Sequence, residues 1–414
     1  MKKVAIVGGG ITGLCSAYYL VKEGFQVTIV DKGNIIDGAS FINAGIVTPS
    51  HFVPIAEPGM INQGIKWMFN SSSPLYIKPR WDTEFFKWAW YFKKASTKKK
   101  VDKAIPVLVD LNLRSRDLYL EILDSLDFEF HMEKKGLLMV YKTEKNQDHE
   151  SKLAEKGKEL GLEVSVLDNK GIKEIEPGFK DNILGGVHYQ CDSHGTPNVF
   201  MSNLKRWLEA HGVQFILEEK VDGFEVAGNT ILSLKTSSER VEADEFLLAS
   251  GGWTTAISKQ LGLNIPIQGG KGYSMDISRN INIKLPAILT EAKVAVTPMQ
   301  NFTRFAGTME LSGNNTKIKR NRVETIAAAA SDFYRDLTLT EEEKESAVSG
   351  LRPISPDGLP FIGKSSQYKN LNVAAGHAMM GWSLGPITGK LLTEIIAKHT
   401  PSVSLDPFIL ERFK

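Results

Sequence analysis

A glycine-rich turn that directly follows a short apolar run is the feature that most constrains the fold of this chain. Residues 4–7 (Val-Ala-Ile-Val) have the composition of a buried parallel strand, and the spacing Gly8-x-Gly10-x-x-Gly13 follows at once. In such a turn the first glycine permits the tight bend, the second lets the backbone approach a pyrophosphate, and the third lets the next helix pack closely on the strand. We therefore predict a βαβ unit that binds a dinucleotide at the N-terminus of a helix over residues 11–23.

The residues after this helix support the same interpretation. Gly24 ends the helix, residues 26–30 form a second apolar strand, and Asp31 closes that strand with a carboxylate that can accept hydrogen bonds from a ribose. An empty βαβ unit with a capping aspartate is the alternative. The chain holds one such fingerprint, whereas reductases that bind both a flavin and a nicotinamide usually need two. The small residues of segment 37–45 would let the backbone approach a flat ring, which favours FAD.

Composition excludes several other classes of protein. The 414 residues suggest two or three folded units, and a net charge of +2 makes nucleic acid an unexpected partner. The two cysteines, Cys15 and Cys191, have no second thiol or spaced histidine pair beside them, so we expect neither a disulfide framework nor a metal site. No run of about 18 apolar residues occurs, and the first apolar run breaks at Gly8. We therefore expect no transmembrane segment, no secretory signal and a cytoplasmic location.

Hydrophobic periodicity predicts further elements of both kinds. Phe200, Leu204 and Trp207 fall on one face of a helix that Gly212 ends. The other predicted elements are strands over 213–217 and 371–375, a hairpin of 294–298 with 302–309, a capping box Thr340-x-x-Glu343 and a helix over 384–399.

Several further motifs follow one another along nearly the whole chain. They are Ala44-Gly45, Ala56-Glu57-Pro58-Gly59, Ile65-Lys66-Trp67-Met68-Phe69, Lys271-Gly272-Tyr273-Ser274, Gly350-Leu351-Arg352-Pro353, Pro356-Asp357-Gly358, Gly376-His377 and Gly381-Trp382. With these motifs the sequence resembles the glutathione-reductase-type FAD proteins of the D-amino-acid oxidase superfamily, and within it the small chain of bacterial D-amino-acid dehydrogenases. The sequence departs from that pattern at Ala378, where the family commonly has glycine. That departure affects the part of the expected cavity wall that lies near the flavin ring.

The resemblance implies an α/β fold in which a glutathione-reductase-type FAD-binding Rossmann-like domain is interleaved with an α+β substrate domain built on an antiparallel sheet. The FAD-binding domain would comprise residues 1–90, 148–258 and 343–414, and the substrate domain residues 91–147 and 259–342. FAD would be held non-covalently, because no cysteine or histidine stands at the usual linkage points. Denaturation should therefore release free FAD.

The expected cofactor contacts come partly from the fingerprint and partly from the resemblance. The resemblance implies that the Val221 backbone pairs with the adenine, although an ordinary core valine is the simpler interpretation, and that segment 246–253 passes beside the ribose and phosphates. The helix that begins near residue 384 would point the positive end of its dipole at the pyrimidine edge of the flavin, unless it is an ordinary capped C-terminal helix. The expected cofactor-binding residues are Gly8, Gly10, Ile11, Thr12, Gly13, Asp31, Lys32, Ser40, Asn43, Ala44, Gly45, Val221, Gly251, Trp253, Gly381, Trp382 and Ser383.

Three residues are candidates for the chemistry. Arg352 lies in an apolar, turn-forming stretch and needs a partner, either a structural carboxylate or, as the resemblance implies, the carboxylate of an amino-acid substrate. Tyr273 could donate its hydroxyl to the same carboxylate or face solvent from a strand. His377 could orient the substrate or contact the flavin through a water, or it could be satisfied by the backbone of its turn.

The resemblance implies the oxidative deamination of D-amino acids, with D-proline and hydroxyproline among the candidates. Arg352 would fix the carboxylate so that the α-carbon lies ~3–3.5 Å from flavin N5 and transfers a hydride. Electrons would then pass to a quinone or another acceptor. Two alternatives remain open, a glycine- or sarcosine-type oxidase that uses O₂ and a non-catalytic flavin-binding sensor. A flavin hydroxylase is disfavoured, because the late Gly-Asp dipeptide of such enzymes is absent.

An aromatic segment over residues 85–92 is followed by Lys93, Lys94 and Lys98-Lys99-Lys100. Aromatic residues at helical spacing usually pack on a sheet, with lysines at the solvated end. The other interpretation is an interfacial helix that inserts aromatic rings among lipid headgroups while its lysines meet anionic lipid. Such a helix would place the protein on the inner membrane face, next to a quinone.

Overall fold

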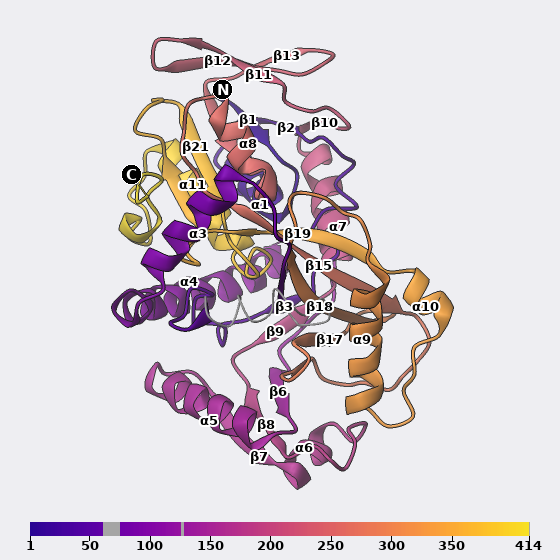
Figure 1. Ribbon diagram of the computed structural model, residues 1–414. Coiled ribbons are helices and arrows are strands. Elements are labelled where there is room, and N and C mark those ends of the chain that lie inside the picture. Colours follow the sequence, from indigo (N-terminus) through magenta and orange to yellow (C-terminus); the bar gives the residue numbers. More distant parts are fainter. Residues whose placement is uncertain (61–74, 126–127, 414) are drawn as a thin grey trace.

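The computed structural model (Figure 1) describes residues 1–60, 75–125 and 128–413. The motif at residues 65–69 lies outside this part of the chain. A six-stranded sheet has the order β10-β2-β1-β14-β21-β20, and its strands are parallel except for β20. Its strands are β1 (Lys3–Val7), β2 (Gln26–Val30), β10 (Gln214–Ile216), β14 (Glu245–Leu248), β20 (Phe361–Lys364) and β21 (Leu371–Ala375).

Both faces of this sheet are covered, as its almost wholly apolar strands require. One face packs on four helices, α1 (Ile11–Lys22), α4 (Lys98–Ser125), α7 (Pro197–Ala210) and α11 (Gly385–Ala397). The other face packs on the small antiparallel sheet of β11 (Gly223–Ala227), β12 (Thr230–Lys235) and β13 (Arg240–Glu242). Glycine lets α1 and α11 approach closely, since a Cβ on Gly389 would lie 2.6 Å from the backbone of Cys15.

A second, nine-stranded sheet is mainly antiparallel and has the order β19-β15-β18-β17-β16-β6-β8-β7, with β4 paired to β18. Its strands are β4 (Leu75–Ile77), β6 (Leu137–Tyr141), β7 (Val164–Asp168), β8 (Gly185–Tyr189), β15 (Gln268–Ile277), β16 (Ala287–Leu289), β17 (Val294–Pro298), β18 (Thr303–Leu311) and β19 (Val348–Ile354). The strands of residues 164–189 and 348–354 belong to this sheet, whereas the division proposed from the sequence places them with the FAD-binding segments.

The remaining elements surround these two sheets. Figure 1 shows α9 beside β17 and β18, and α5 and α6 beside β6, β7 and β8. A short sheet has the order β3 (Ile46–Val47), β9 (Ser193–Gly195) and β5 (Met132–Glu133). The other helices are α3 (Thr83–Ala95), α5 (Glu144–Glu159), α6 (Asn169–Ile175), α8 (Thr254–Lys259), α9 (Arg320–Phe333) and α10 (Glu341–Glu345), with 3₁₀ turns at Gly251–Trp253 and Asp406–Phe408.

Several elements predicted from the sequence are confirmed. The hairpin of residues 294–309 is the antiparallel pair β17 and β18, and Thr340 and Glu343 form a complete capping box at α10. The first strand, the helix after it and the strand that ends before Asp31 are β1, α1 and β2. Local patterns suffice for these elements because turn chemistry and apolar spacing agree there.

Candidate functional site

One deep cavity of about 960 Å³ is lined by residues from both large sheets, at the carboxyl ends of β1, β2 and β14. This volume is at the upper end of the range for ligand pockets, which is roughly 300–1,000 Å³. In open α/β sheets, ligands bind at the carboxyl ends of the strands.

The glycine turn after β1 is shaped for close backbone approach. Gly8 has a φ of +113°, which favours glycine, and a Cβ there would lie 2.5 Å from the carbonyl oxygen of Ala249. A Cβ on Gly13 would lie 1.9 Å from the carbonyl oxygen of Gly8. Gly8 lines the cavity, whereas Gly13 lies behind the turn and lets α1 pack against it. The first turn of α1, with Ile11 and Thr12, also lines the cavity.

Asp31 is held in place by the backbone around it. Its carboxylate accepts hydrogen bonds from the N–H groups of Gly9 at 2.6 Å and Gly33 at 2.8 Å. A carboxylate has about four acceptor positions, so two remain for a ligand. Asp31 lines the cavity. The predicted hydrogen bonds to a ribose are compatible with this arrangement.

The segment of small residues closes over the helix N-terminus. The Ser40 hydroxyl accepts the N–H of Ile11 at 3.1 Å, so its own proton is left for another acceptor. Asn43 bonds to the Ser40 carbonyl and to the N–H of Gly45. Gly10, Ser40, Asn43 and Ala44 line the cavity. Gly45 does not, because it lies against β9, where a Cβ would be 2.3 Å from the carbonyl oxygen of Gly195.

A cation–aromatic pair stands beside the turn after β14. The Lys32 ammonium lies 3.3 Å from the centroid of the Trp253 ring, and burial lowers the pKa of this lysine. Both residues line the cavity together with Gly251. Val221 is 4% exposed, so it belongs to the core and also contributes to the cavity wall.

Arg352 reaches the cavity from β19. Its Nη1 donates a hydrogen bond to the carbonyl of Thr308 at 3.0 Å, and among the described residues no carboxylate forms an ion pair with it. Burial lowers the pKa of Arg352 to about 10, which leaves the guanidinium charged at neutral pH. A structural carboxylate, one of its two expected partners, is therefore absent from the described part of the chain. The guanidinium group of Arg352 therefore remains available to a ligand.

Two features of the sheet create room for this guanidinium. A Cβ on Gly272 of β15 would lie 1.9 Å from Arg352 Nη1, so the side chain passes directly over this glycine. A bulge in the pairing of β15 with β18 puts Thr308 in the left-handed region, at φ +58°. The bulge turns the Thr308 carbonyl toward Arg352, and the Thr308 hydroxyl is buried without a hydrogen-bond partner in the described residues.

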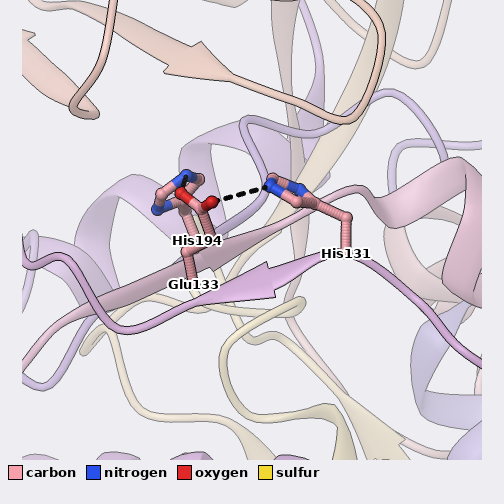
Figure 2. A group of neighbouring side chains, drawn as sticks. All are labelled: His131, Glu133 and His194. Carbon is pink, nitrogen blue, oxygen red and sulfur yellow. Dashed lines mark ion pairs between the residues drawn. The ribbon is translucent and has the colours of Figure 1, made fainter.

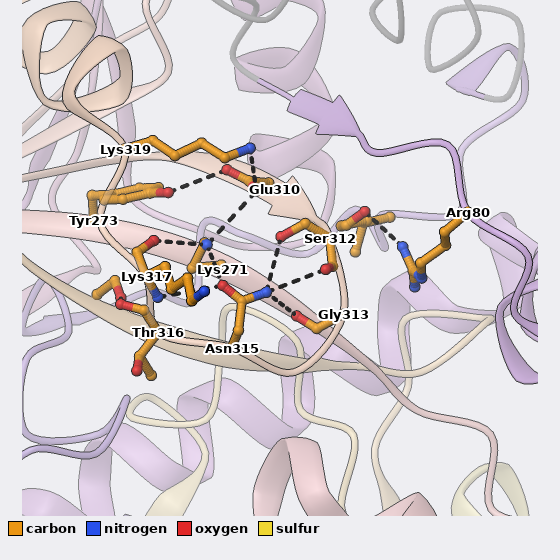
Figure 3. Close-up of polar contacts among 12 residues, drawn as sticks. Arg80, Lys271, Tyr273, Glu310, Ser312, Gly313, Asn315, Thr316, Lys317 and Lys319 are labelled. Atoms are coloured by element: carbon orange, nitrogen blue, oxygen red, sulfur yellow. Dashed lines mark hydrogen bonds and ion pairs between the residues drawn. The ribbon is translucent and has the colours of Figure 1, made fainter.

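Tyr273 is 1% exposed, so the interpretation of a solvent-facing strand tyrosine is wrong. Tyr273 contributes to the cavity lining, but its side chain packs in the core cluster that includes α9, and its hydroxyl donates to Glu310 at 3.1 Å within a buried polar network (Figure 3). Lys319 and Lys271 stand 2.7 and 3.7 Å from the same carboxylate. Burial would raise the pKa of Glu310, but the bonds from Lys319, Ser312 and Lys271 hold it below its usual range. In this arrangement the Tyr273 hydroxyl is not a free donor for a substrate carboxylate.

His377 lies on the turn that leads into α11. Its Nε2 is 3.0 Å from the hydroxyl of Thr388, and burial lowers the pKa of the ring to about 4, so the imidazole is neutral at physiological pH. The turn is tied to β19, because the Ala378 N–H donates to the Pro353 carbonyl at 2.7 Å. Ala378 has a φ of +51°, which gives a physical reason for the glycine common at this position. His377 and Arg352 thus line the same cavity.

The residues before α11 have two different environments. Gly381 and Trp382 line the cavity, and the Trp382 carbonyl accepts the hydroxyl of Tyr119 at 2.7 Å. Ser383 lies outside the cavity lining. Its hydroxyl donates to Asn112 of α4 at 2.8 Å and accepts the N–H of Thr48 at 2.9 Å. Ser383 thus fixes the position of the turn from behind.

A chain of polar groups that the sequence analysis missed also reaches the cavity. The Ser50 hydroxyl donates to Asp192 and lies 3.1 Å from His51 Nδ1, and His51 lines the cavity. When Asp192 is ionised, the Ser50 proton is directed to it, so Nδ1 carries the His51 proton and Nε2 is an acceptor. Burial raises the pKa of Asp192 to about 7 and lowers that of His51 to about 4. Nothing in the local pattern marks a loop histidine whose neighbour Ser50 bonds to a carboxylate 142 residues away.

Comparison with known proteins identifies the family. A family model described as FAD dependent oxidoreductase (DAO) matches residues 3–395. The chain belongs to this family. FAD is therefore the dinucleotide to be placed in the cavity, and the glycine turn without Cβ atoms, the Asp31 carboxylate and the open N-terminus of α1 fit it.

Full-length relatives support the assignment. Proteins named D-amino acid dehydrogenase from Granulibacter bethesdensis and Agrobacterium fabrum are 30% and 29% identical, each over 99% of both chains. Among solved structures, glycine oxidase from Geobacillus kaustophilus has a TM-score of 0.79 at 20% identity and covers 100% of this chain and 99% of its own. L-proline dehydrogenase from P. horikoshii has a TM-score of 0.76 at 17% identity and covers 100% and 97%. These two structures share the fold, which confirms the predicted fold class.

Proposed function

We propose that this FAD-dependent oxidoreductase oxidises D-amino acids and passes the electrons to an acceptor other than O₂. The observation that carries the proposal is Arg352, a charged fork in the cavity wall without a carboxylate partner among the described residues. The D-amino acid dehydrogenases at about 30% identity support the same substrate class.

The chain's own groups would hold the substrate at three points. Arg352 binds the carboxylate through two parallel hydrogen bonds, which suit a planar group. Neutral His51 accepts a hydrogen bond from the substrate amine through Nε2, and Asp192 and Ser50 fix the tautomer that makes this acceptor available. Met139 contributes to the cavity wall that would surround the substrate side chain. Bound FAD supplies the redox chemistry by accepting a hydride from the α-carbon.

Positioning is the main contribution of the protein to this reaction. A carboxylate, an amine and a side chain held at three points would leave the α-hydrogen one direction, which converts an encounter between two molecules into a reaction within one complex. The neutral imidazoles of His51 and His377 add no positive charge that would oppose formation of a cationic imine product. Water then hydrolyses the imine after release.

An anaerobic screen tests the proposal. The purified FAD-bound protein is mixed with D-amino acids, including D-proline and hydroxyproline, with L-amino acids and with N-methyl glycines, and loss of the oxidised flavin absorbance is followed. We expect bleaching by D-amino acids. Bleaching only by glycine or sarcosine would replace the proposal by an oxidase of that type, and no bleaching by any amine would indicate a non-catalytic flavin protein. Peroxide formed in air at the anaerobic rate would contradict a separate acceptor.

We further propose that α3 attaches the protein to an anionic membrane, where a quinone accepts the electrons. No helix in the described residues is both long and apolar enough to cross a bilayer. The inner face of α3 is buried, and Trp88 donates its indole N–H to the Ile354 carbonyl at 2.9 Å, which confirms packing on the sheet for this residue. Exposed residues on α3 and beside it make up an aromatic–basic surface. Trp81 precedes α3, Lys98–Lys100 begin α4, and α3 itself contributes Phe86, Trp90, Lys93 and Lys94.

The exposure of the tryptophan rings decides which residues to replace in a membrane-binding test. Trp81 is 98% exposed and Trp90 is 50% exposed, whereas Trp88 is 5% exposed, so replacing Trp88 would disturb the core. Flotation with vesicles of phosphatidylglycerol should recover the wild type, and a Trp81→Ser, Trp90→Ser double variant should stay unbound. A Trp207→Ser variant on α7 controls for loss of a partly buried tryptophan. Equal recovery of wild type and double variant would reject the membrane proposal.

A further inference from the structure

The small sheet under the cavity brings three potential metal ligands onto one face. His194 lies on the central strand β9, opposite Glu133 of β5 and Ile46 of β3. Directly opposed residues in a sheet share a face, and so do residues two apart in one extended segment, which puts His131 beside Glu133. Figure 2 shows the two imidazole rings on either side of the Glu133 carboxylate.

Two of the distances in this cluster approach those of a coordination site. Glu133 Oε1 lies 3.7 Å from His131 Nε2, and Oε2 lies 3.5 Å from His194 Nε2. One ligand atom from each of the three residues lies within 4.8 Å of the others. Ligands held ~2.0–2.2 Å from a tetrahedral zinc ion stand roughly 3.3–3.6 Å apart. The groups are therefore too far apart for good hydrogen bonds and close to the spacing that one ion would impose.

His194 provides the strongest indication that a partner belongs here. Its side chain is 0% exposed, and neither ring nitrogen has a hydrogen-bond partner in the described residues. Buried polar atoms almost always have a partner, so an imidazole with two unpaired nitrogens calls for one.

A supporting contact fixes the orientation of the other ring. His131 Nδ1 lies 3.0 Å from the hydroxyl of Thr196, which leaves Nε2 directed at Glu133. Metal-bound histidines usually have such a second contact, which sets their tautomer. The side chains of His131 and Glu133 are 19% and 34% exposed, so water can reach a fourth coordination position.

We propose that His131, Glu133 and His194 bind one Zn²⁺ ion. Two imidazole nitrogens and one carboxylate oxygen are a common three-residue donor set for zinc, with water as the fourth ligand. The ion would join β5 to β9, and β9 is paired through His194 to Ile46, a residue of the cavity wall. Zinc would thus stabilise the part of the protein that supports FAD without touching the proposed substrate.

Lys135 provides a test that distinguishes a zinc site from a cluster that only stabilises the fold. Its ammonium lies 2.8 Å from Glu133 Oε2 and its side chain is 51% exposed, so it neutralises the carboxylate without metal and can turn into solvent when an ion binds. Removing this charge should strengthen zinc binding. We expect a Lys135→Met variant to bind Zn²⁺ about tenfold more tightly, equivalent to ~1.4 kcal/mol.

The experiment uses FAD-bound protein that has been treated with a chelator and then titrated with Zn²⁺ by calorimetry. The wild type should bind one equivalent, and its thermal midpoint should rise with Zn²⁺. His194→Gln should lose binding at least a hundredfold, whereas His149→Gln, at an exposed histidine of α5, should bind like the wild type. If His194→Gln does not retain FAD, the more exposed Glu133→Gln provides the same comparison. Absence of stoichiometric binding by the wild type, or equal binding by the His194 and His149 variants, would overturn the proposal.

Discussion

Arg352 offers the sharpest prediction about catalysis. We expect Arg352→Met to remove two charge-assisted hydrogen bonds to the substrate carboxylate, each contributing about 1.5–3 kcal/mol. Their loss is ~3–6 kcal/mol, and since 1.4 kcal/mol is tenfold, kcat/KM should fall by roughly 10² to 10⁴. Arg352→Lys keeps the charge but loses the fork, so it should lose about half of that free energy.

A third variant tests the same contact without changing Arg352 itself. A Cβ at residue 272 would lie 1.9 Å from Arg352 Nη1, so Gly272→Ala should push the guanidinium out of position. Anaerobic stopped-flow reduction of the flavin gives the substrate Kd and the reduction rate separately. All three variants should keep the flavin spectrum while their Kd for a D-amino acid rises. An unchanged Kd in Arg352→Met, or wild-type behaviour of Gly272→Ala, would refute the carboxylate contact.

Three other variants test the support of the site. Burial raises the pKa of Asp192 from 3.8 to about 7, so between pH 7 and pH 3.8 the folded state binds a proton that the unfolded state does not. The free energy of unfolding should therefore rise as the pH falls through this range, by up to ~4 kcal/mol. Asp192→Asn should lack this pH dependence in a series of thermal midpoints, and equal slopes for variant and wild type would contradict the assignment. Ser383→Ala should lose about 1–3 kcal/mol of stability, measured by thermal unfolding, because the buried Asn112 oxygen and Thr48 N–H lose their partner. Gly13→Ala should be purified without FAD, because its Cβ would displace the turn at Gly8, and a normal flavin content would argue against the tight turn.

The retention of FAD can be tested on the wild type. We expect acid precipitation to leave all flavin absorbance in the supernatant, because the predicted contacts are non-covalent. Flavin that stays with the precipitated protein would contradict this expectation.

Sequence patterns predicted the parts of this fold whose geometry is local. The spacing of Gly8, Gly10 and Gly13 indicates a βαβ unit because each glycine is required where a Cβ would clash with backbone or ligand a few residues away. The hairpin of residues 294–309 follows from two apolar runs with a short polar connection. The Thr340 capping box follows from a spacing of three residues.

Contacts between distant segments could not be predicted in the same way. His51 becomes a candidate only because Asp192 folds against Ser50, and His194 becomes a candidate ligand only because β9 pairs with β5. Pairings of such long sequence separation leave no periodic signal. Trp88 shows the same limit, since one aromatic run contains both a buried ring and, two residues on, the half-exposed Trp90.

A crystal structure of the FAD-bound protein with pyrrole-2-carboxylate, a planar and unreactive analogue of proline, tests the central claim most directly. We predict that its carboxylate accepts two hydrogen bonds from Arg352, at ~2.7–2.9 Å, with the ring lying against the flavin. A carboxylate bound elsewhere in the cavity, or a guanidinium turned away from it, would contradict the proposed role of Arg352.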